Sequence, residues 1–200
     1  MLTAVSPIKI LVADDHAAVR LGISRLLTDQ HDMRVVAEAT SATEAVRMSG
    51  GVDVAVVDYH LGDRNGLWVT RRLRELDPAP AVLVFSAFAD DALTVAAIVA
   101  GAEGVLGKTA VGDEVCRAVR LLARGRTHLP RVADSVVQAM GSRLGPRDRA
   151  VFGMLVHGLA DHEAAERLGT TTFQIESARS SILSVLAPSA TRARDALPSS

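Results

Sequence analysis

Five short apolar segments alternate with segments of helical character through the first 125 residues, and this alternation constrains the fold more than any other feature. None of the five is longer than eight residues, and they are rich in Val, Ile and Ala. They are Ile8–Asp15, Met33–Ala39, Asp53–Asp58, Ala81–Ala87 and Gly104–Lys108. Runs of this length and composition are typical of parallel strands that are buried on both faces.

The intervening segments have helical periodicity. In the first of them, Val19, Ile23, Leu26 and Leu27 fall at i, i+4, i+7 and i+8, which places them on one apolar face. The last, Asp113 to Gly125, shows the same pattern. Strands that alternate with helices imply right-handed crossovers and a doubly wound parallel sheet. We therefore predict an α/β, flavodoxin-like (βα)5 domain over residues 1–125.

The rest of the chain has a different organisation. Residues 126–143 are punctuated by Gly and Pro and predict a linker, in which Val132 to Met140 could form one short helix. Three helical segments follow: Pro146–His157, Asp161–Leu168 and Thr172–Leu186. Short helices around a Gly-containing turn favour a helix-turn-helix. We predict a small all-α domain of this type over residues 144–200.

Composition narrows the class of protein. Apolar residues make up 48% and charged residues 22% of the 200 residues, as in soluble globular proteins. Cys116 is the only cysteine, so no internal disulfide can form. The stretch before the first strand lacks the features of a signal peptide, and no apolar run approaches the ~20 residues needed to span a bilayer. We expect a cytoplasmic protein without a membrane segment.

Side chains that can carry chemistry end four of the five predicted strands. They are Asp14 and Asp15 at the first strand, Asp58 at the third, Ser86 at the fourth and Lys108 at the fifth. In an open parallel sheet these ends meet at one edge, which is where ligands bind. Three carboxylates held together repel one another unless a cation lies among them, and hard oxygen ligands suit Mg²⁺. Asp58 is then both a nucleophile and a metal ligand.

On these residues, Ile8 to Gly125 resembles the receiver domain of two-component response regulators. The resemblance implies that Asp58 accepts a phosphoryl group from a sensor histidine kinase. It implies a Mg²⁺ site formed by Asp14, Asp15, Asp58 and the backbone carbonyl of His60. Lys108 is then expected to pair with the phosphoryl oxygens, and Ser86 to donate a hydrogen bond to them and draw its loop inward.

Two positions depart from the receiver pattern, and two residues near the site bear on alternative readings. Gly62 stands where a proline is usual, and Val105 where a Tyr or Phe is usual. His16, directly after the acidic pair, is expected to be a surface residue at a helix start rather than a metal ligand. A phosphatase of the haloacid dehalogenase type shares the fold but requires a second Asp two residues after the nucleophile, where this chain has His60. We therefore expect no enzyme of that class.

The segment LGPRDRAVFGMLVHGLADHEAAERLG, Leu144 to Gly169, resembles the LuxR-type helix-turn-helix of NarL/FixJ-class regulators. In that family the third helix enters DNA and begins Thr-Val-Lys-x-His. Here it reads QIESA, so Glu176 occupies the Lys position and Ala178 the His position. Loss of a cation removes a phosphate or guanine contact, and an outward Glu is repelled by the DNA backbone.

Helical spacing predicts which residues of this helix face DNA. An inner face is expected from Ile175, Ala178, Ile182, Val185 and Leu186. Candidate DNA-facing residues are Glu176, Ser177, Arg179 and Ser180, with Ser184 also outward. Phosphates could be held by Arg147, Arg149 and Arg167.

A homodimer is expected because Ala92 to Ala102 is apolar nearly all round.

The leading hypothesis is a phosphorylation-controlled response regulator that binds promoter DNA through an atypical recognition helix. The intact helix-turn-helix pattern favours this reading. The rival is a signalling protein whose degenerate helix-turn-helix binds another protein, and Glu176 favours that one.

Overall fold

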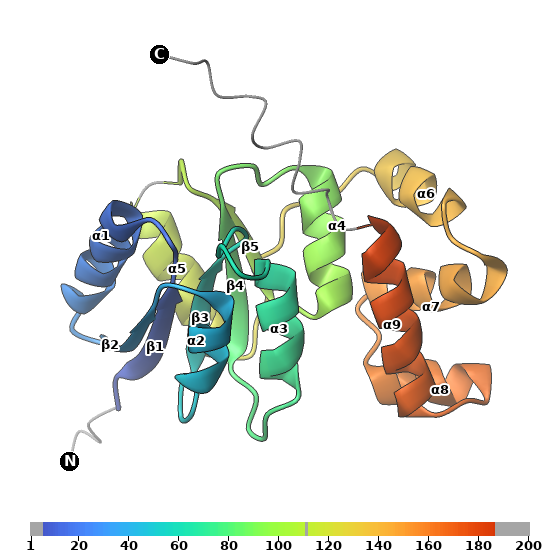
Figure 1. Ribbon diagram of the computed structural model, residues 1–200, viewed down its shortest axis with the longest axis horizontal. Coiled ribbons are helices and arrows are strands. Elements are labelled where there is room, and N and C mark those ends of the chain that lie inside the picture. The colour runs from blue at the N-terminus through green and yellow to red at the C-terminus, as the bar shows by residue number, and fades with distance from the viewer. Residues whose placement is uncertain (1–5, 111, 187–200) are drawn as a thin grey trace. The chain divides into compact units, whose positions relative to one another are not determined.

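The computed structural model describes residues 6–110 and 112–186 (Figure 1). Its contacts divide the chain into two units. The first comprises the residues up to 89 together with residues 100–131. The second comprises residues 90–99 together with those from 132 onward. Among the described residues, no helix is long and apolar enough to cross a membrane.

The first unit is built on a five-stranded sheet in the order β2-β1-β3-β4-β5. The strands are β1 (Ile8–Ala13), β2 (Met33–Ala39), β3 (Val54–Asp58), β4 (Ala81–Ser86) and β5 (Gly104–Gly107). Every neighbouring pair is parallel. The change of direction in strand order between β1 and β3 makes the sheet doubly wound. The predicted flavodoxin-like (βα)5 fold is therefore confirmed.

Helices cover both faces of this sheet (Figure 1). On one face are α1 (Ala17–Thr28) and α5 (Gly112–Leu122), and on the other are α2 (Ala42–Arg47) and α3 (Gly66–Arg74). Alternate strand residues such as Ile10, Val12 and Leu83 join Leu27 and Val119 in one buried apolar cluster. Burial of apolar side chains on both faces explains why the strands read as continuous apolar runs.

The second unit is helical. It contains α4 (Asp91–Ala100), α6 (Asp134–Ser142), α7 (Pro146–Val156), α8 (Asp161–Leu168) and α9 (Thr172–Leu186). The three helices expected for the helix-turn-helix lie at α7, α8 and α9, and Gly169, whose φ is 60°, caps the C-terminus of α8. The short helix expected in the linker forms as α6. Because most residues of α4 are buried within the chain, its apolar character does not require a second chain. The homodimer thus stays a prediction without that argument.

Candidate functional site

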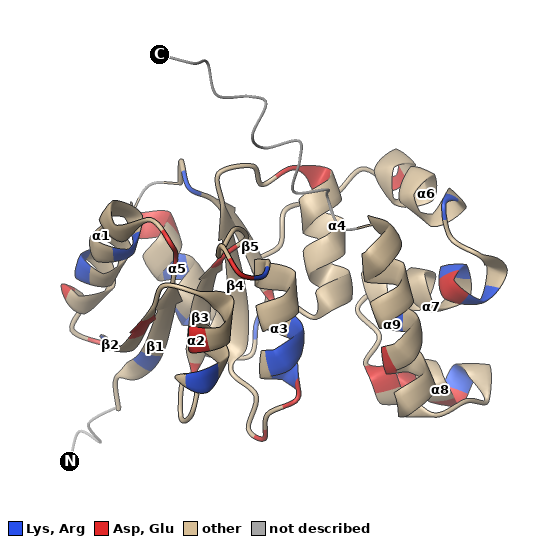
Figure 2. Cartoon of the chain, in the orientation of Figure 1, with Lys and Arg blue, Asp and Glu red and all other residues tan. Residues whose placement is uncertain are grey.

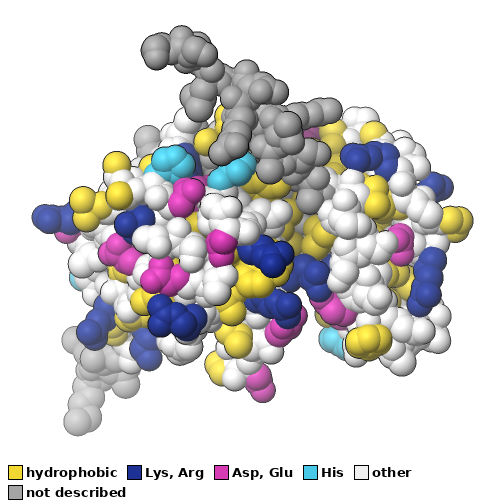
Figure 3. Space-filling model, viewed as in Figure 1, with side chains coloured by type: hydrophobic (Ala, Val, Ile, Leu, Met, Phe, Trp, Pro, Cys, Tyr) yellow, Lys and Arg dark blue, Asp and Glu magenta, His cyan; other side chains and the backbone are white. Residues whose placement is uncertain are grey.

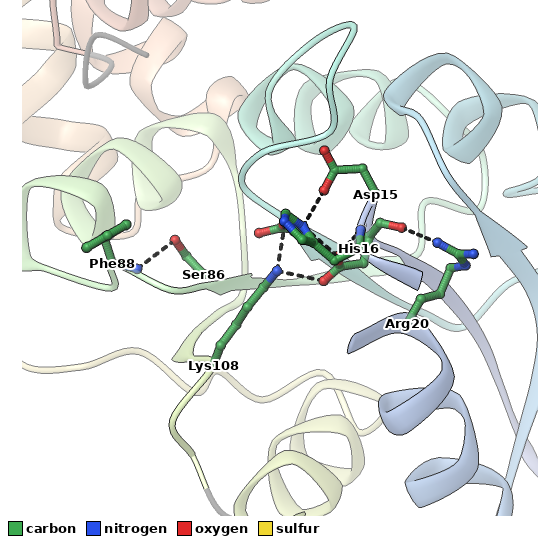
Figure 4. A network of polar contacts seen from close by, with 8 residues as sticks. Asp15, His16, Arg20, Ser86, Phe88 and Lys108 are labelled. Atoms are coloured by element: carbon green, nitrogen blue, oxygen red, sulfur yellow. Dashed lines mark hydrogen bonds and ion pairs between the residues drawn. The ribbon is translucent and has the colours of Figure 1, made fainter. Parts of the chain in front are cut away.

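The five side chains singled out at the strand ends lie at one edge of the sheet, and Figure 4 labels three of them, Asp15, Ser86 and Lys108. Asp58 is the last residue of β3 and Ser86 the last of β4. Asp14 and Asp15 follow β1 directly, and Lys108 follows β5. Asp58 pairs in register with Phe85 of β4, which brings Ser86 to the same level of the sheet. Parallel pairing alone therefore assembles the site.

Lys108 links the two buried carboxylates. Its Nζ lies 2.7 Å from Oδ2 of Asp14 and 2.8 Å from Oδ2 of Asp58. Both aspartates are only 3% exposed. A buried carboxylate is costly unless a cation compensates its charge, and here one ammonium group serves two carboxylates.

The surroundings shift the pKa values of this pair. Burial raises the pKa of the Asp58 carboxyl, and the opposing contact with Lys108 does not cancel that effect. Burial on its own lowers the pKa of Lys108, but its hydrogen bonds to Asp14 and Asp58 outweigh burial and raise the pKa. The surroundings therefore favour the charged form of Lys108, whereas burial disfavours the charged form of Asp58.

The carboxylates form a group that fits a hard cation. Asp14, Asp15, His16 and Asp58 each offer a ligand atom, and these atoms all lie within 4.8 Å of one another. Three of the four are carboxylate oxygens, the ligand type that Mg²⁺ prefers. The donor set therefore fits the metal that the sequence predicts. An imidazole nitrogen is a poorer match, which agrees with the expectation that His16 is not a ligand.

His16 is exposed, as expected, but it also contacts the acidic pair. Its Nδ1 lies 2.7 Å from Oδ1 of Asp15, and its backbone N–H donates to Oδ1 of Asp14 at 2.8 Å (Figure 4). Arg20 is a further neighbour, which the sequence did not indicate. Its Nη1 donates to the backbone carbonyl of Asp14 at 2.7 Å. Only the position of Arg20 one turn into α1 could have suggested this contact.

The loop after β3 approaches Asp58 closely. The backbone N–H of Gly66 donates to the carbonyl of Tyr59 at 2.7 Å. A Cβ at Gly66 would lie 2.4 Å from the backbone oxygen of Asp58, so glycine is required there. The backbone of His60 hydrogen-bonds to the Asp58 carboxyl. Nothing in these contacts tests the predicted role of the His60 carbonyl, which stays a prediction.

Ser86 is fully buried at the end of β4. Its Oγ accepts a hydrogen bond from the backbone N–H of Phe88 at 3.2 Å (Figure 4). The hydroxyl hydrogen of Ser86 can still be donated to another acceptor, because a serine hydroxyl is both donor and acceptor. This arrangement couples Ser86 to the start of the β4–α4 loop.

In the second unit, α9 buries most of the face that helical spacing predicts. Ile175, Ala178, Ile182 and Leu186 are buried, whereas Val185 is 38% exposed and Leu183 takes its place inside. The expectation that Val185 lies on the inner face was therefore wrong. Ser177 and Ser184 are exposed, and Glu176 and Ser180 are half-buried. Figure 2 shows α9 as largely tan, since Glu176 and Arg179 are its only charged residues.

Arg179 does not face outward, and this part of the prediction is wrong. It is only 8% exposed, and it is hydrogen-bonded to the carboxylate of Asp161 at the start of α8. Its Nε also lies 3.2 Å from Oε2 of Glu176. The backbone carbonyl of Val99, in α4 of the same unit, accepts from its Nη1. The guanidinium is thus held by acceptors within the unit.

The three arginines that the sequence suggested for phosphates are all exposed, and one of them also makes hydrogen bonds within the unit. Arg149 donates to the carbonyls of Gly141, Ser142 and Leu144, which fixes the turn before α7. Arg147 and Arg167 are exposed, and Arg147 lines a pocket of about 280 Å³ together with Thr170 and Gln174. Arg147 and Arg167 therefore remain candidates for phosphate contacts, whereas its hydrogen bonds hold Arg149 against the turn before α7.

Known proteins share both the sequence and the fold. The family profile "Response regulator receiver domain" matches residues 10–120. The DNA-binding transcriptional activator DevR/DosR of Mycobacterium tuberculosis is 32% identical over 173 residues, which cover 80% of each chain. The transcriptional regulatory protein UhpA of Salmonella typhimurium is 34% identical over 182 residues, which cover 90% of this chain and 91% of that protein.

Solved structures agree. A LuxR-family two-component response regulator from Aurantimonas sp. SI85-9A1 is 32% identical with a TM-score of 0.61, over 67% of this chain and 98% of that one. The response regulator ChrA of a heme-sensing two-component system is 26% identical with a TM-score of 0.55, over 94% of this chain and 98% of that one. With the receiver match and the strand-end geometry, these likenesses show that the chain belongs to the two-component response regulators of the NarL/FixJ class, which join a receiver domain to a LuxR-type helix-turn-helix.

Proposed function

We propose that this chain is a phosphorylation-controlled transcription regulator, in which Asp58 accepts a phosphoryl group from a sensor histidine kinase. The observation that carries the proposal is the convergence of Asp14, Asp15, Asp58 and Lys108 at one edge of the sheet. The names of DevR/DosR and UhpA support a transcriptional role. We propose a protein that accepts phosphate and passes on a signal rather than one that turns over a substrate.

In the proposed reaction, an Oδ atom of Asp58 attacks the phosphorus of a phosphohistidine in line with the bond to the imidazole nitrogen. The new bond is O–P, the broken bond is N–P, and the imidazole leaves with the electron pair. Asp14, Asp15, Asp58 and the His60 carbonyl would hold Mg²⁺, which when bound supplies charge neutralisation at the phosphoryl oxygens. Lys108, already beside Asp58, is placed to pair with one of those oxygens afterwards.

Ser86 is the residue proposed to read the phosphorylated state. Its hydroxyl can donate to a phosphoryl oxygen while Oγ keeps its bond from the N–H of Phe88. If Ser86 shifts toward the phosphate, the β4–α4 loop moves with it through the bond to Phe88. The added charge on Asp58 is thereby converted into a change of backbone position.

The experiment is labelling with acetyl phosphate and Mg²⁺. One base-labile phosphoryl group per chain is expected, and Asp58→Asn should not be labelled. Equal labelling of Asp58→Asn would refute the assignment of the nucleophile.

For the output, we propose binding to promoter DNA by a dimer through α8 and α9, with contacts weaker than a basic recognition helix would make. Support comes from the helix-turn-helix geometry and from the exposed Arg147 and Arg167. On the face seen in Figure 3, Lys/Arg and Asp/Glu side chains are interspersed, so no broad field of one sign attracts DNA there. A gel shift with genomic fragments, with and without phosphorylation, tests this output.

A second output is favoured by one specific observation, which is the composition at the start of α9. Phe173 is 80% exposed there, and the only arginine of the helix is held by Asp161 and Glu176. An exposed aromatic on a helix whose one arginine is paired within the protein suits a protein partner better than a DNA backbone. The absence of any shift with genomic DNA, phosphorylated or not, would make this the leading output.

A further inference from the structure

The loop that carries His60 has little intrinsic rigidity. It connects β3 to α3 and contains Gly62, whose φ of 69° is in the left-handed region that favours glycine. A glycine leaves the unfolded loop many conformations, and a fixed position for its backbone therefore needs external contacts. The His60 carbonyl can act as a metal ligand only if the loop holds one position.

Asp63 supplies contacts that fix this loop. Its carboxylate accepts three hydrogen bonds from the start of α2. The donors are the N–H of Ala42 at 2.8 Å, the N–H of Thr43 at 3.1 Å and the hydroxyl of Thr43 at 2.6 Å. These hydrogen bonds, with that from the Thr43 side chain foremost, lower the pKa of Asp63 to about 2. A carboxylate at a helix N-terminus is also favoured by the helix dipole.

The start of α2 has a cap of its own. Oγ of Ser41 accepts from the N–H of Glu44 at 3.2 Å, and Oε2 of Glu44 accepts from the N–H of Thr40 at 2.7 Å. Ser41 thus caps α2, and the Glu44 side chain reaches back to the residue before the cap, so the N-terminus of α2 is held by two side chains. The hydrogen bonds that Asp63 accepts therefore join the β3–α3 loop to a helix N-terminus that is already capped.

The segment joined in this way borders the other side of the acidic site. The backbone N–H of Asp14 donates to the carbonyl of Ala39, the last residue of β2, at 3.1 Å. Ala42 follows three residues later, and Asp63 binds its N–H. On the far side of the loop, Asn65 caps α3 by accepting from the N–H of Trp68 at 2.9 Å. His60 thus lies in a segment tied at one end to β3 and at the other to both α2 and α3.

We propose that Asp63 is a positioning residue for the Mg²⁺ site, which fixes the His60 carbonyl relative to the carboxylates of Asp14 and Asp15 by tying the β3–α3 loop to the N-terminus of α2. The inference rests on the proposed function, because it concerns the same metal site. Asp63 does not touch the phosphoryl group or the metal. Its role is to restrict the conformations of the β3–α3 loop, so that the carbonyl oxygen of His60 keeps one position.

The test compares Mg²⁺ affinity with stability in the full chain. Trp68 is the only tryptophan and lies in the first turn of α3, so its fluorescence reports Mg²⁺ binding nearby. Asp63→Ala is expected to weaken apparent Mg²⁺ binding roughly tenfold, at the low end of what outer partners of metal ligands contribute. Labelling by acetyl phosphate should then need more Mg²⁺ but reach the parent's rate at saturation.

Ser41→Ala is the matched control, because it removes a cap of α2 without touching the β3–α3 loop. It should lower the melting temperature and leave the Mg²⁺ affinity unchanged. Asp63→Asn keeps one acceptor oxygen and should retain part of the Mg²⁺ affinity that Asp63→Ala loses. If Asp63→Ala does not fold, Asp63→Asn replaces it in the comparison with Ser41→Ala. Parent-like Mg²⁺ affinity in the Asp63 variants, or an equal loss in Ser41→Ala, would overturn the positioning role. A parent protein that neither responds to Mg²⁺ nor is labelled would overturn the proposed function itself.

Discussion

Lys108 binds the carboxylate of Asp58 directly, with 2.8 Å between Nζ and Oδ2, although 50 residues separate them in the sequence. The same ammonium group binds Asp14 at 2.7 Å. One cation therefore compensates two buried anions in the unphosphorylated protein. A phosphoryl group on Asp58 changes what Lys108 can bind, so this residue is placed to sense the modification.

Lys108→Ala should separate phosphorylation from its consequence. The carboxylates of Asp14, Asp15 and Asp58 remain, so acetyl phosphate and Mg²⁺ should still label Asp58. Without the ammonium group, labelling should no longer change the oligomeric state, as measured by light scattering. Lys9→Ala, at the other lysine of the chain and exposed on β1, is the control and should behave like the parent. A phosphorylation-dependent change in oligomeric state that survives in Lys108→Ala would contradict this role.

Asp15→Ala should abolish labelling, because it removes one of three carboxylates within 4.8 Å of one another. A cation that needs several oxygen ligands then loses part of its site. Titration of Trp68 fluorescence with Mg²⁺ measures the loss directly. Asp29→Ala, an exposed change at the far end of α1, serves as the control. Equal Mg²⁺ quenching in the parent and Asp15→Ala would show that Asp15 is not a ligand.

The fold and the receiver site could be predicted because both depend on local patterns. Apolar runs of strand length locate the strands, and parallel topology then brings Asp58, Ser86 and Lys108 to one edge. Neither step needs knowledge of individual contacts. The same reasoning located α7, α8 and α9 of the second unit, since Gly and Pro mark helix ends.

Contacts between residues distant in sequence could not be predicted in this way. Helical spacing places Arg179 where it could face outward, but spacing on α9 does not report that Asp161 on α8 lies within reach. The hydrogen bonds that Asp63 accepts from α2 could not be predicted for the same reason, nor could the hydrogen bond from Arg20 to the Asp14 carbonyl. Each depends on how two elements pack, which periodicity within one element does not encode.

Stability at acid pH should depend on the ion pair of Asp32 and Arg120. Hydrogen bonds from Arg120, with Nε at 2.7 Å from Oδ2, lower the pKa of Asp32 from 3.8 to about 2. A lowered pKa contributes stability that is complete above the unfolded value and is lost as pH falls from about 4 to about 2. Both side chains are partly exposed, so solvent screening limits the contribution to about 1 kcal/mol or less.

The measurement is urea unfolding of the parent and Arg120→Ala between pH 2 and pH 6. The variant should be less stable than the parent at pH 6, and the difference should shrink toward pH 2. Arg117→Ala, an exposed change on the same helix, is the control and should show no such convergence. A constant difference across the whole pH range would mean that the ion pair is not its cause.

Arg179→Ala should destabilise the second unit. The change leaves Asp161 and Glu176 without the guanidinium that binds both, and it removes a donor to the Val99 carbonyl. Hydrogen bonds to charged groups contribute roughly 1.5–3 kcal/mol each, so a clear fall in melting temperature is expected by calorimetry. Arg167→Ala, exposed on α8, should leave the melting temperature nearly unchanged. Similar shifts in the two variants would contradict a specific role for Arg179.

Glu176→Lys tests whether α9 faces DNA. Glu176 is half-buried near the start of the helix and pairs with Arg179, so its carboxylate is partly neutralised within the protein. Exchange for Lys removes a charge that a phosphate repels and adds one that a phosphate attracts. Each additional phosphate neutralised releases about one counterion and makes the salt dependence of binding correspondingly steeper. The phosphorylated dimer carrying Glu176→Lys should therefore bind DNA more tightly than the parent, with a slope steeper by about one counterion per subunit.

The experiment is a salt titration of both proteins on the same duplex. Ser184→Lys adds a positive charge at an exposed position two turns further along α9, away from the end expected to enter the groove, and is the matched control. If Ser184→Lys tightens binding as much as Glu176→Lys, the gain reflects net charge and not the position of Glu176. If neither the affinity nor the slope changes in Glu176→Lys, this end of α9 does not face DNA. The exposed Phe173 three residues earlier then becomes the first position to substitute in a search for a protein partner, because a buried aromatic anchor is what such an interface commonly requires.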